Sequence, residues 1–287
     1  MGIDIHSARL LAIAKKRGVN FGRVLMLGHQ DMNVSAPALA RILSDAGCTL
    51  PMDSTATTWT GFADPLFAAL GATEIRSLDA SSYQQATVQH DLNQPIPESW
   101  RMKYDVVYDG GTLEHVFNFP TALRNAMDMV RIGGRLFLDQ GINNWCGHGF
   151  YQFSPELFFR VFCAENGYEL ERVVVHSVNP FARWYEVTDP AILRSRIELL
   201  SWLPLMIFVQ ARRIAATPVL ERMPQQSDYA TAWSTTGNQT PGAIKRFQWL
   251  EWCRPLATLA RALHTMWRLT RTHSFANRAA FRPVSKR

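Results

Sequence analysis

The chain has 287 residues, is 47% hydrophobic and carries a net charge of +6, which is enough for one large core with an appendage. Its longest apolar run, 199–209, contains Pro204 and is far shorter than the roughly 20 residues that span a bilayer. The four cysteines are widely spaced, and no leader with a basic and then an apolar segment opens the chain. We therefore expect a cytoplasmic protein with neither a disulfide framework nor a zinc site.

Helical patterns and short apolar runs alternate along residues 1–214. Ser154 and Pro155 are typical of an N-cap followed by the first helical position. The expected helices are 6–17, 36–46, 65–70, 119–130, which Gly133 and Gly134 would end, and 154–167. Residues 48–62 are rich in Thr, Ser, Pro and Asp and are expected to form a loop.

Five short runs are β-branched or apolar, and most of them end in an acid or a glycine. This pattern is typical of buried parallel strands that open into a ligand crevice at their carboxyl ends. The runs are Arg23–Gly28, Glu74–Asp79, Thr87–Asp91, Val106–Tyr108 with Asp109, and Gly134–Asp139. Two later runs, 169–178 and 205–212, suit a final antiparallel pair. The sequence therefore predicts a doubly wound α/β sheet built around a small-molecule site.

Two motifs add a family resemblance to this pattern. Residues 109–116 read Asp-Gly-Gly-Thr-Leu-Glu-His-Val after the fourth strand, and residues 147–156 read Gly-His-Gly-Phe-Tyr-Gln-Phe-Ser-Pro-Glu after the fifth. Over residues 20–212 the chain resembles the class I S-adenosylmethionine-dependent methyltransferases. The resemblance implies a Rossmann-like, seven-stranded methyltransferase sheet. We expect this domain to cover residues 1–214, followed by a polar linker at 215–244 and a basic helical tail at 245–287.

The resemblance implies S-adenosylmethionine as cofactor and assigns residues to it. Gly28 would form the first turn, where His29 departs from the three closely spaced glycines usual in the family. Asp79 and Ala80 would hold the ribose, with a turn or N-cap role for Asp79 as the alternative. The remaining expected cofactor residues are Asp91 and Leu92 at the adenine, with a turn role before Pro95 as the equally favoured alternative for Asp91, and Asp109, Gly110 and Gly111 beneath the methyl group.

The acceptor side of the site is expected in two places. His115 follows the fourth strand and is a candidate general base, because the ordinary pKa of histidine lies near operating pH. The glycine-rich loop 140–153 offers His148, Tyr151 and Gln152 at the carboxyl edge of the sheet. Structural roles in packing and hydrogen bonding are the alternative for both. No metal site is expected.

The expected function is methyl transfer from S-adenosylmethionine to an O or N atom of a small molecule or glycan. The alternative is a methyltransferase-like binding or scaffold protein without catalysis, which the Gly28-His29-Gln30 turn favours. A nicotinamide oxidoreductase is disfavoured because no G-x-G-x-x-G motif follows the first strand.

Basic residues gather near the carboxyl end. From Lys245 onward ten lysines and arginines stand against one acid, Glu251, a net charge of +9 that leaves about −3 for residues 1–244. Residues 245–271 form an amphipathic helical pattern that could dock on the domain, or contact a membrane surface or a partner protein. Nucleic acid is not expected as a partner, because no motif for it is present.

Overall fold

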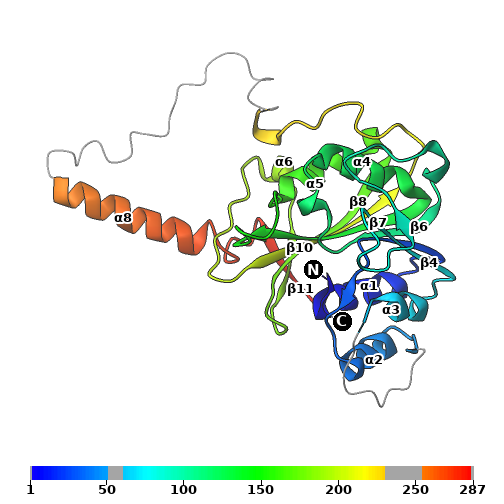
Figure 1. Ribbon diagram of the computed structural model, residues 1–287. Coiled ribbons are helices and arrows are strands. Elements are labelled where there is room, and N and C mark those ends of the chain that lie inside the picture. The colour runs from blue at the N-terminus through cyan, green and yellow to red at the C-terminus, as the bar shows by residue number, and fades with distance from the viewer. Residues whose placement is uncertain (1, 51–60, 230–253, 286–287) are drawn as a thin grey trace.

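The computed structural model describes residues 2–50, 61–229 and 254–285. Its centre is a nine-stranded sheet in the order β11-β9-β8-β10-β7-β6-β2-β4-β5, with helices on both faces (Figure 1). The strands of this sheet are β2 (Arg23–Leu27), β4 (Glu74–Asp79), β5 (Val88–Gln89), β6 (Tyr104–Asp109), β7 (Val130–Asn143), β8 (Tyr168–Ser177), β9 (Trp184–Val187), β10 (Leu205–Arg213) and β11 (Phe281–Val284). Two further short strands, β1 (Gly2–Ile3) and β3 (Asp31–Met32), pair with each other.

The sheet confirms the expected Rossmann-like architecture. Strands β5, β4, β2, β6 and β7 are parallel, and β10 runs antiparallel between β7 and β8. From β2 the chain first builds outward through β4 and β5, and then returns to the other side of β2 to build β6 and β7. The strand order therefore reverses between β2 and β6, which is where open α/β sheets bind their ligands.

The helices divide between the two faces of the sheet. α4 (Phe119–Met129) and α5 (Pro155–Val161) cover one face, and α1 (Ile5–Lys16), α2 (Ala36–Asp45) and α3 (Asp64–Ala69) cover the other (Figure 1). α6 (Pro190–Leu193) packs Leu193 against the core beneath α4 and α5, whereas α8 (Arg254–Arg271) lies beyond these layers (Figure 1). The Ser154 side chain accepts a hydrogen bond from the Glu156 N–H, which confirms the expected N-cap of α5. None of the helices in the described part of the chain has the length and hydropathy to cross a bilayer.

Each face of the sheet has its own hydrophobic core, because successive side chains of a strand point to opposite faces. In β6, Val107 packs beneath α4, whereas Val106 and Tyr108 pack beneath the amino-terminal helices. Phe208 of β10 likewise faces the amino-terminal helices while its neighbours Ile207 and Val209 face the other way. The strand runs are therefore apolar on both faces.

The region after α4 differs from the sequence expectation. The helix ends at Met129, and Gly133 and Gly134 lie inside the long strand β7 instead of closing the helix. A Cβ on Gly134 would approach the Asp105 carbonyl oxygen to 2.7 Å, so close packing against β6 requires glycine there. The register between β6 and β7 shifts at this point.

The domain also extends beyond the expected boundary at residue 214. Val219 and Leu220 are buried, and the Arg124 guanidinium donates a hydrogen bond of 2.8 Å to the Leu220 carbonyl. At the end of the tail, β11 pairs with β9 and Phe281 is fully buried. These parts of the expected linker and tail therefore belong to the domain. Residues 230–253, which hold the rest of that linker and the first part of the expected final helix, lie outside the described residues.

Candidate active site

A cavity of about 360 Å³ lies at the carboxyl ends of β2, β4, β5 and β6. Its volume is within the range of small-molecule sites, about 300–1,000 Å³. The lining residues are Gly28, His29, Gln30, Leu78, Asp79, Ala80, Gln84, His90, Asp91, Leu92, Asn93, Gly111, Thr112, His115 and Val116. All the predicted cofactor residues except Asp109 and Gly110 line it.

The turn after β2 brings two strands of the site together. Gly28 has φ +69°, and a Cβ there would lie 2.7 Å from the Thr112 hydroxyl oxygen. That hydroxyl donates a hydrogen bond of 2.7 Å to the Leu27 carbonyl. Glycine is therefore needed both for the backbone conformation and for the close approach of Thr112, which joins the end of β2 to the segment after β6.

His29 forms a side wall of the cavity. Its Nδ1 lies 2.7 Å from the Gln84 carbonyl oxygen, its Nε2 lies 2.8 Å from Asp64 Oδ2, and its ring stacks on Phe62 with centroids 3.5 Å apart. The imidazole is thus held by contacts to α3 and to the loop after β4. His29 is bulkier than a glycine would be at this position, but these contacts hold its ring at the side and the cavity stays open.

Gln30 fills the space between the ends of β2 and β6. Its side chain is buried and its amide N–H donates to the Leu27 carbonyl. Its Oε1 has no hydrogen-bond partner among the described residues and would lie 2.5 Å from a Cβ on Gly110. Gly110 is therefore a glycine because Gln30 occupies the place of its side chain.

The two acids predicted to contact the nucleoside part of the cofactor both lie at the cavity. Asp79 ends β4, and its Oδ1 accepts a hydrogen bond of 3.0 Å from the Ser81 N–H. Asp91 Oδ1 accepts two hydrogen bonds from Asn93, through the backbone N–H at 2.9 Å and the side-chain amide at 2.7 Å. These bonds lower the pKa of Asp91, so the group is a carboxylate at neutral pH. Each acid combines a turn role with a place at the cavity.

Asp109 lies below the cavity and is fully buried. It accepts a hydrogen bond of 2.8 Å from the Thr112 N–H and another from the Gln140 side-chain amide. Burial raises the pKa of Asp109 to about 7, although the backbone N–H groups of Thr112 and Leu113 act in the opposite direction. The position therefore holds a carboxyl group that is partly protonated near neutral pH.

A second buried acid, Asp139 of β7, extends this polar region towards the amino terminus. The Ser7 hydroxyl donates to Asp139 and also lies 2.9 Å from Asp4 Oδ1. Burial raises the pKa of Asp139 well above its ordinary value, and the neighbouring charge of Asp4 adds to the effect. The sequence alone does not predict this cluster, because only the tertiary fold brings α1 against β7.

The two histidines predicted to face the acceptor, His115 and His148, lie together at the rim. Their ring centroids are 4.9 Å apart, and His115 lines the cavity. Burial lowers the pKa of His115, with a further contribution from His148, and burial also lowers the pKa of His148. Both rings are therefore neutral at pH 7, the state in which an imidazole nitrogen can accept a proton.

Glu114 lies behind the two histidines. Its side chain is buried, its Oε1 is 3.6 Å from His148 Nε2, and neither carboxyl oxygen has a hydrogen-bond partner in the described ranges. Burial raises the pKa of Glu114 to about 8, and the nearby Asp109 adds to this rise. The group is therefore mainly a neutral acid at pH 7 and not the anion of an ion pair.

Tyr151 and Gln152 shape the loop and do not line the cavity. The Tyr151 hydroxyl donates a hydrogen bond of 2.7 Å to the Phe117 carbonyl, and its ring packs against Phe119. Gln152 Oε1 accepts a hydrogen bond of 3.0 Å from the Trp145 N–H. The structure thus brings His115 and His148 together and holds Tyr151 in the packing beside them.

Two groups of side chains within the described residues have the spacing of metal ligands. Glu114, His115 and His148 place one ligand atom each within 4.8 Å of one another, and so do Asp4, His6 and His176. In the second group, His6 Nδ1 accepts a hydrogen bond of 2.9 Å from Trp184, and His6 Nε2 lies 2.8 Å from the Asn179 carbonyl. Metal binding there would break an existing hydrogen bond, whereas the first group is open at the rim.

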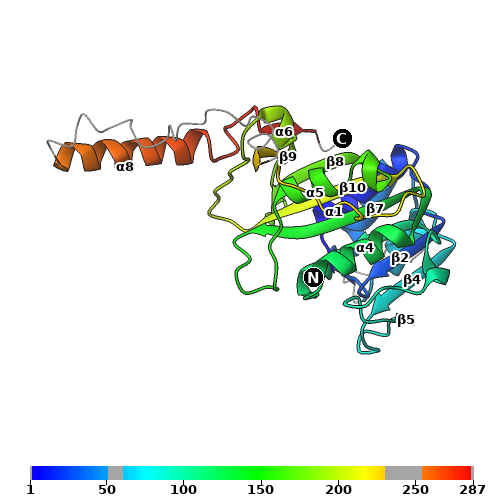
Figure 2. The same cartoon turned by 90° about the horizontal axis from the view of Figure 1, so that it is seen from above.

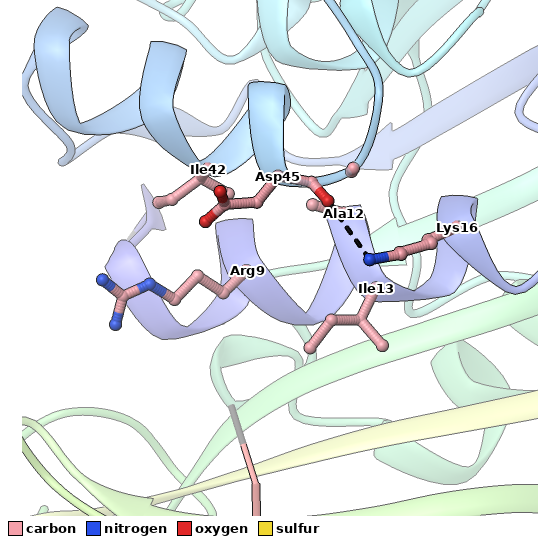
Figure 3. A pocket seen from close by; sticks show the side chains of 7 residues that line it. Arg9, Ala12, Ile13, Lys16, Ile42 and Asp45 are labelled. Carbon is pink, nitrogen blue, oxygen red and sulfur yellow. Dashed lines mark hydrogen bonds between the residues drawn. The ribbon is translucent and has the colours of Figure 1, made fainter. Parts of the chain in front are cut away.

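A separate cavity of about 330 Å³ lies between α1 and α2 (Figure 3). Arg9 and Lys16 of α1 face Asp45 of α2 across it, and Lys16 Nζ lies 3.4 Å from the Asp45 carbonyl oxygen. It contains none of the predicted site residues. Its position between two helices, away from the strand ends, makes the cavity at the sheet edge the candidate site.

Neither a protein-family model nor a curated protein matches this chain. A branched-chain polyamine synthase from Thermus thermophilus matches at 15% identity and TM-score 0.37, over 77% of this chain and 61% of that one, which is less than two thirds of the synthase. The N-methyltransferase NodS from Bradyrhizobium japonicum matches at 11% identity and TM-score 0.40, over 73% and 96% of the two chains. An S-adenosylmethionine-dependent methyltransferase from Mesorhizobium loti matches at 14% and TM-score 0.38, over 73% and 100%.

The fold class rests on the sheet itself and not on these scores. Seven expected strands are present, the last two are antiparallel, and the cavity lies at the reversal of strand order. The chain therefore has the fold of the class I S-adenosylmethionine-dependent methyltransferases.

Proposed function

We propose that this protein transfers a methyl group from S-adenosylmethionine to an O or N atom of a small molecule or glycan. One observation carries the proposal. Residues assigned to the cofactor from four separate strand ends line one cavity of about 360 Å³, and His115 stands at its rim. The parallel strands bring these ends to one edge of the sheet, and a cavity of small-molecule size opens there.

The hydrogen-bond acceptors and the apolar contact at this cavity suit a nucleoside with an attached amino acid. One oxygen of Asp79 accepts from Ser81, and the other has no hydrogen-bond partner in the described chain and is available to ribose hydroxyls. Gln30 Oε1 is buried and has no hydrogen-bond partner among the residues that the structure describes, so it is an acceptor suited to an ammonium group. Leu92 is a buried apolar contact for a purine ring. When bound, S-adenosylmethionine supplies a methyl group that its sulfonium already activates.

The chain's own contribution is positioning and proton removal. Alignment of two bound reactants can supply roughly 7–11 kcal/mol of a barrier, and a general base adds roughly 10²–10⁴-fold. The neutral His115 is the group at the cavity rim suited to accept a proton from the acceptor. His148 packs against it, and burial together with this neighbouring ring lowers the pKa of His115, which favours the neutral ring.

An exposed aromatic pair beside the histidines favours an acceptor with a flat apolar face. Phe117 and Phe150 are mostly exposed and lie edge to face with centroids 5.6 Å apart. The Phe150 N–H donates a hydrogen bond of 2.9 Å to the Glu114 carbonyl, which fixes this pair beside the histidines. Aromatic rings and the apolar faces of sugars are the groups that such a surface binds.

A binding protein without catalysis is the second candidate, and Gln30 is the observation that favours it. Its side chain occupies the space between Gly28 and Gly110, close to where the methionine part of the cofactor would lie. A ligand consisting of a nucleoside alone would fit without moving it.

Calorimetric titration of the full chain with S-adenosylmethionine, S-adenosylhomocysteine, adenosine and NADH tests the proposal. We expect micromolar binding of both sulfur ligands. Asp79→Asn should weaken it by about 10- to 100-fold, because a hydrogen bond to a charged group contributes about 1.5–3 kcal/mol. Asp45→Asn, at the cavity between α1 and α2, is the matched control and should leave affinity unchanged.

The other outcomes are equally informative. Binding of adenosine without either sulfur ligand would favour the non-catalytic candidate. Binding of NADH alone, or equal affinities for wild type and Asp79→Asn, would contradict the proposed site.

A further inference from the structure

Helix α8 lies apart from the rest of the molecule. It extends away from the sheet and its covering helices in two perpendicular views (Figures 1 and 2). Wherever its side chains are described they are exposed, apart from Ala260 and His264, which are half-buried. Docking on the domain was one of the expectations from the sequence, but among the described residues α8 approaches the domain at its carboxyl end, where Arg268 lies near Glu198.

The exposed surface of α8 is strongly two-sided. Five large apolar side chains stand at positions i, i+3, i+7, i+10 and i+11, which puts them on one face of a helix. They are Leu256, Leu259, Leu263, Met266 and Trp267, each roughly half exposed or more. Arg261 and Arg268 lie on the opposite face, and no acidic residue occurs between 254 and 271. An apolar face of this kind on a water-exposed helix indicates a contact surface.

A second copy of the helix is a poor occupant for this face. The 18 residues of α8 hold little more than two heptads, whereas a coiled coil needs about three or four. The charged residues of α8 are all cationic, so it offers no ion pairs of opposite sign to a second α8. The partner should therefore be anionic, and it should accept an apolar face along the full helix length of about 27 Å.

We propose that α8 binds the surface of an anionic lipid bilayer, with its leucine, methionine and tryptophan face in the acyl boundary. A helix with Trp and Leu on one face and arginines on the other is the type that lies in the membrane interface, with its apolar face about 5–10 Å deep. Arg271 flanks this face, and the long arginine side chains can reach the headgroups. The charges of Arg261 and Arg268, on the opposite face of the helix, would then lie within about a Debye length, ~8 Å, of the membrane surface.

A loop of the domain adds apolar surface at the carboxyl end of α8. The Leu200 N–H donates a hydrogen bond of 2.8 Å to the His273 carbonyl, and Arg268 lies 3.4 Å from Glu198. Leu203 beside them is about half exposed, and Trp202 is fully exposed. Tryptophan is enriched at membrane interfaces, so the loop would anchor the base of the helix while α8 lies along the surface.

Cosedimentation of the full chain with vesicles tests this surface without reference to catalysis. Phosphatidylcholine vesicles with phosphatidylglycerol should bind the protein at least tenfold more tightly than phosphatidylcholine alone, and added salt should weaken that binding. The double variants Leu259→Ser with Leu263→Ser, and Arg261→Gln with Arg268→Gln, should each lose at least tenfold in affinity for the anionic vesicles.

Matched controls change the same chemistry elsewhere on the surface. They are Ile132→Ser with Met223→Ser, and Arg41→Gln with Arg222→Gln, all exposed and away from α8. These should bind like wild type, and all the variants should keep the wild-type unfolding curve. Equal binding by wild type and both α8 variants would overturn the proposal. A second result would also overturn it: wild-type protein that does not bind anionic vesicles but sediments as a dimer, when the Leu259→Ser with Leu263→Ser variant does not form that dimer. Titration with S-adenosylmethionine is a separate readout, so either proposal can fail alone.

Discussion

Asp109 connects the chemistry of a single carboxyl group to the stability of the fold. Its folded-state pKa of about 7 stands against an ordinary value of 3.8, and the cause is burial below the cavity. Because the folded-state pKa is raised, the native state holds a proton that the unfolded chain releases. The stabilisation is complete below about pH 4 and is lost as the pH rises to about 7.

We predict that the Asp109→Asn variant does not show this loss of stability between about pH 4 and 7. One pKa unit corresponds to 1.36 kcal/mol, so the wild-type free energy of unfolding should fall by at most about 4 kcal/mol relative to the variant between pH 4 and 7. The asparagine oxygen can keep the hydrogen bond from Thr112, and a flip of the Gln140 amide, whose Oε1 has no hydrogen-bond partner in the described residues, can satisfy the new N–H group. Urea unfolding at a series of pH values measures the difference. A difference that does not change with pH would refute the assignment.

The predicted residues that line the cavity share one property, and the polar residues near it that were not predicted share another. Asp79, Asp91 and His115 follow strand patterns, and parallel strands end at one edge, so their proximity could be predicted from local sequence. The contact of Ser7 with Asp139 and the place of Gln30 depend on how α1 and the first turn pack. No spacing in the sequence reports that packing. Glu114 was visible in its motif, but its burial without a hydrogen-bond partner was not.

At the scale of elements, strands could be placed more reliably than the ends of helices. The strands of the parallel core are short and apolar on both faces, which distinguishes them from the amphipathic helices between them. The pair Gly133-Gly134 was misassigned as a helix end, because glycine serves close strand packing and helix termination equally well. Strand β11 was missed, because four residues containing Pro283 do not read as a strand.

Phe281 is the residue through which β11 should stabilise the domain. It is fully buried, its ring lies edge to face with Phe275 at 5.3 Å, and its backbone pairs with Val187. We predict that Phe281→Ala lowers the free energy of unfolding by about 3–5 kcal/mol, as for other buried aromatic truncations. Arg282→Ala, on the exposed side of the same strand, should change it by no more than about 0.5 kcal/mol. Equal effects in urea unfolding would mean that β11 is not docked in solution.

At the scale of the whole molecule, the sequence and the structure agree on a basic tail and differ on where the domain ends. The charge asymmetry was visible in the composition, because ten of the thirty basic residues lie beyond position 244. The return of the chain to the sheet after α8 could not be predicted from the composition, because the edge pairing between β9 and β11 joins segments about one hundred residues apart. The tail thus contains an exposed helix and a buried strand with different roles.

These roles predict different results for two deletions. Removal of 254–271 takes away a helix whose described side chains are almost all exposed, and leaves β11 attached through residues 230–253. The free energy of unfolding should change little, while binding to anionic vesicles should be lost. A chain that ends at residue 253 also loses Phe281 and the pairing of β9, so its unfolding free energy should fall by at least the roughly 3–5 kcal/mol of the Phe281 truncation. Urea unfolding of the two deletions in parallel gives the comparison. Equal destabilisation would place α8 within the cooperative unit and remove the basis for treating it as an independent membrane-binding surface.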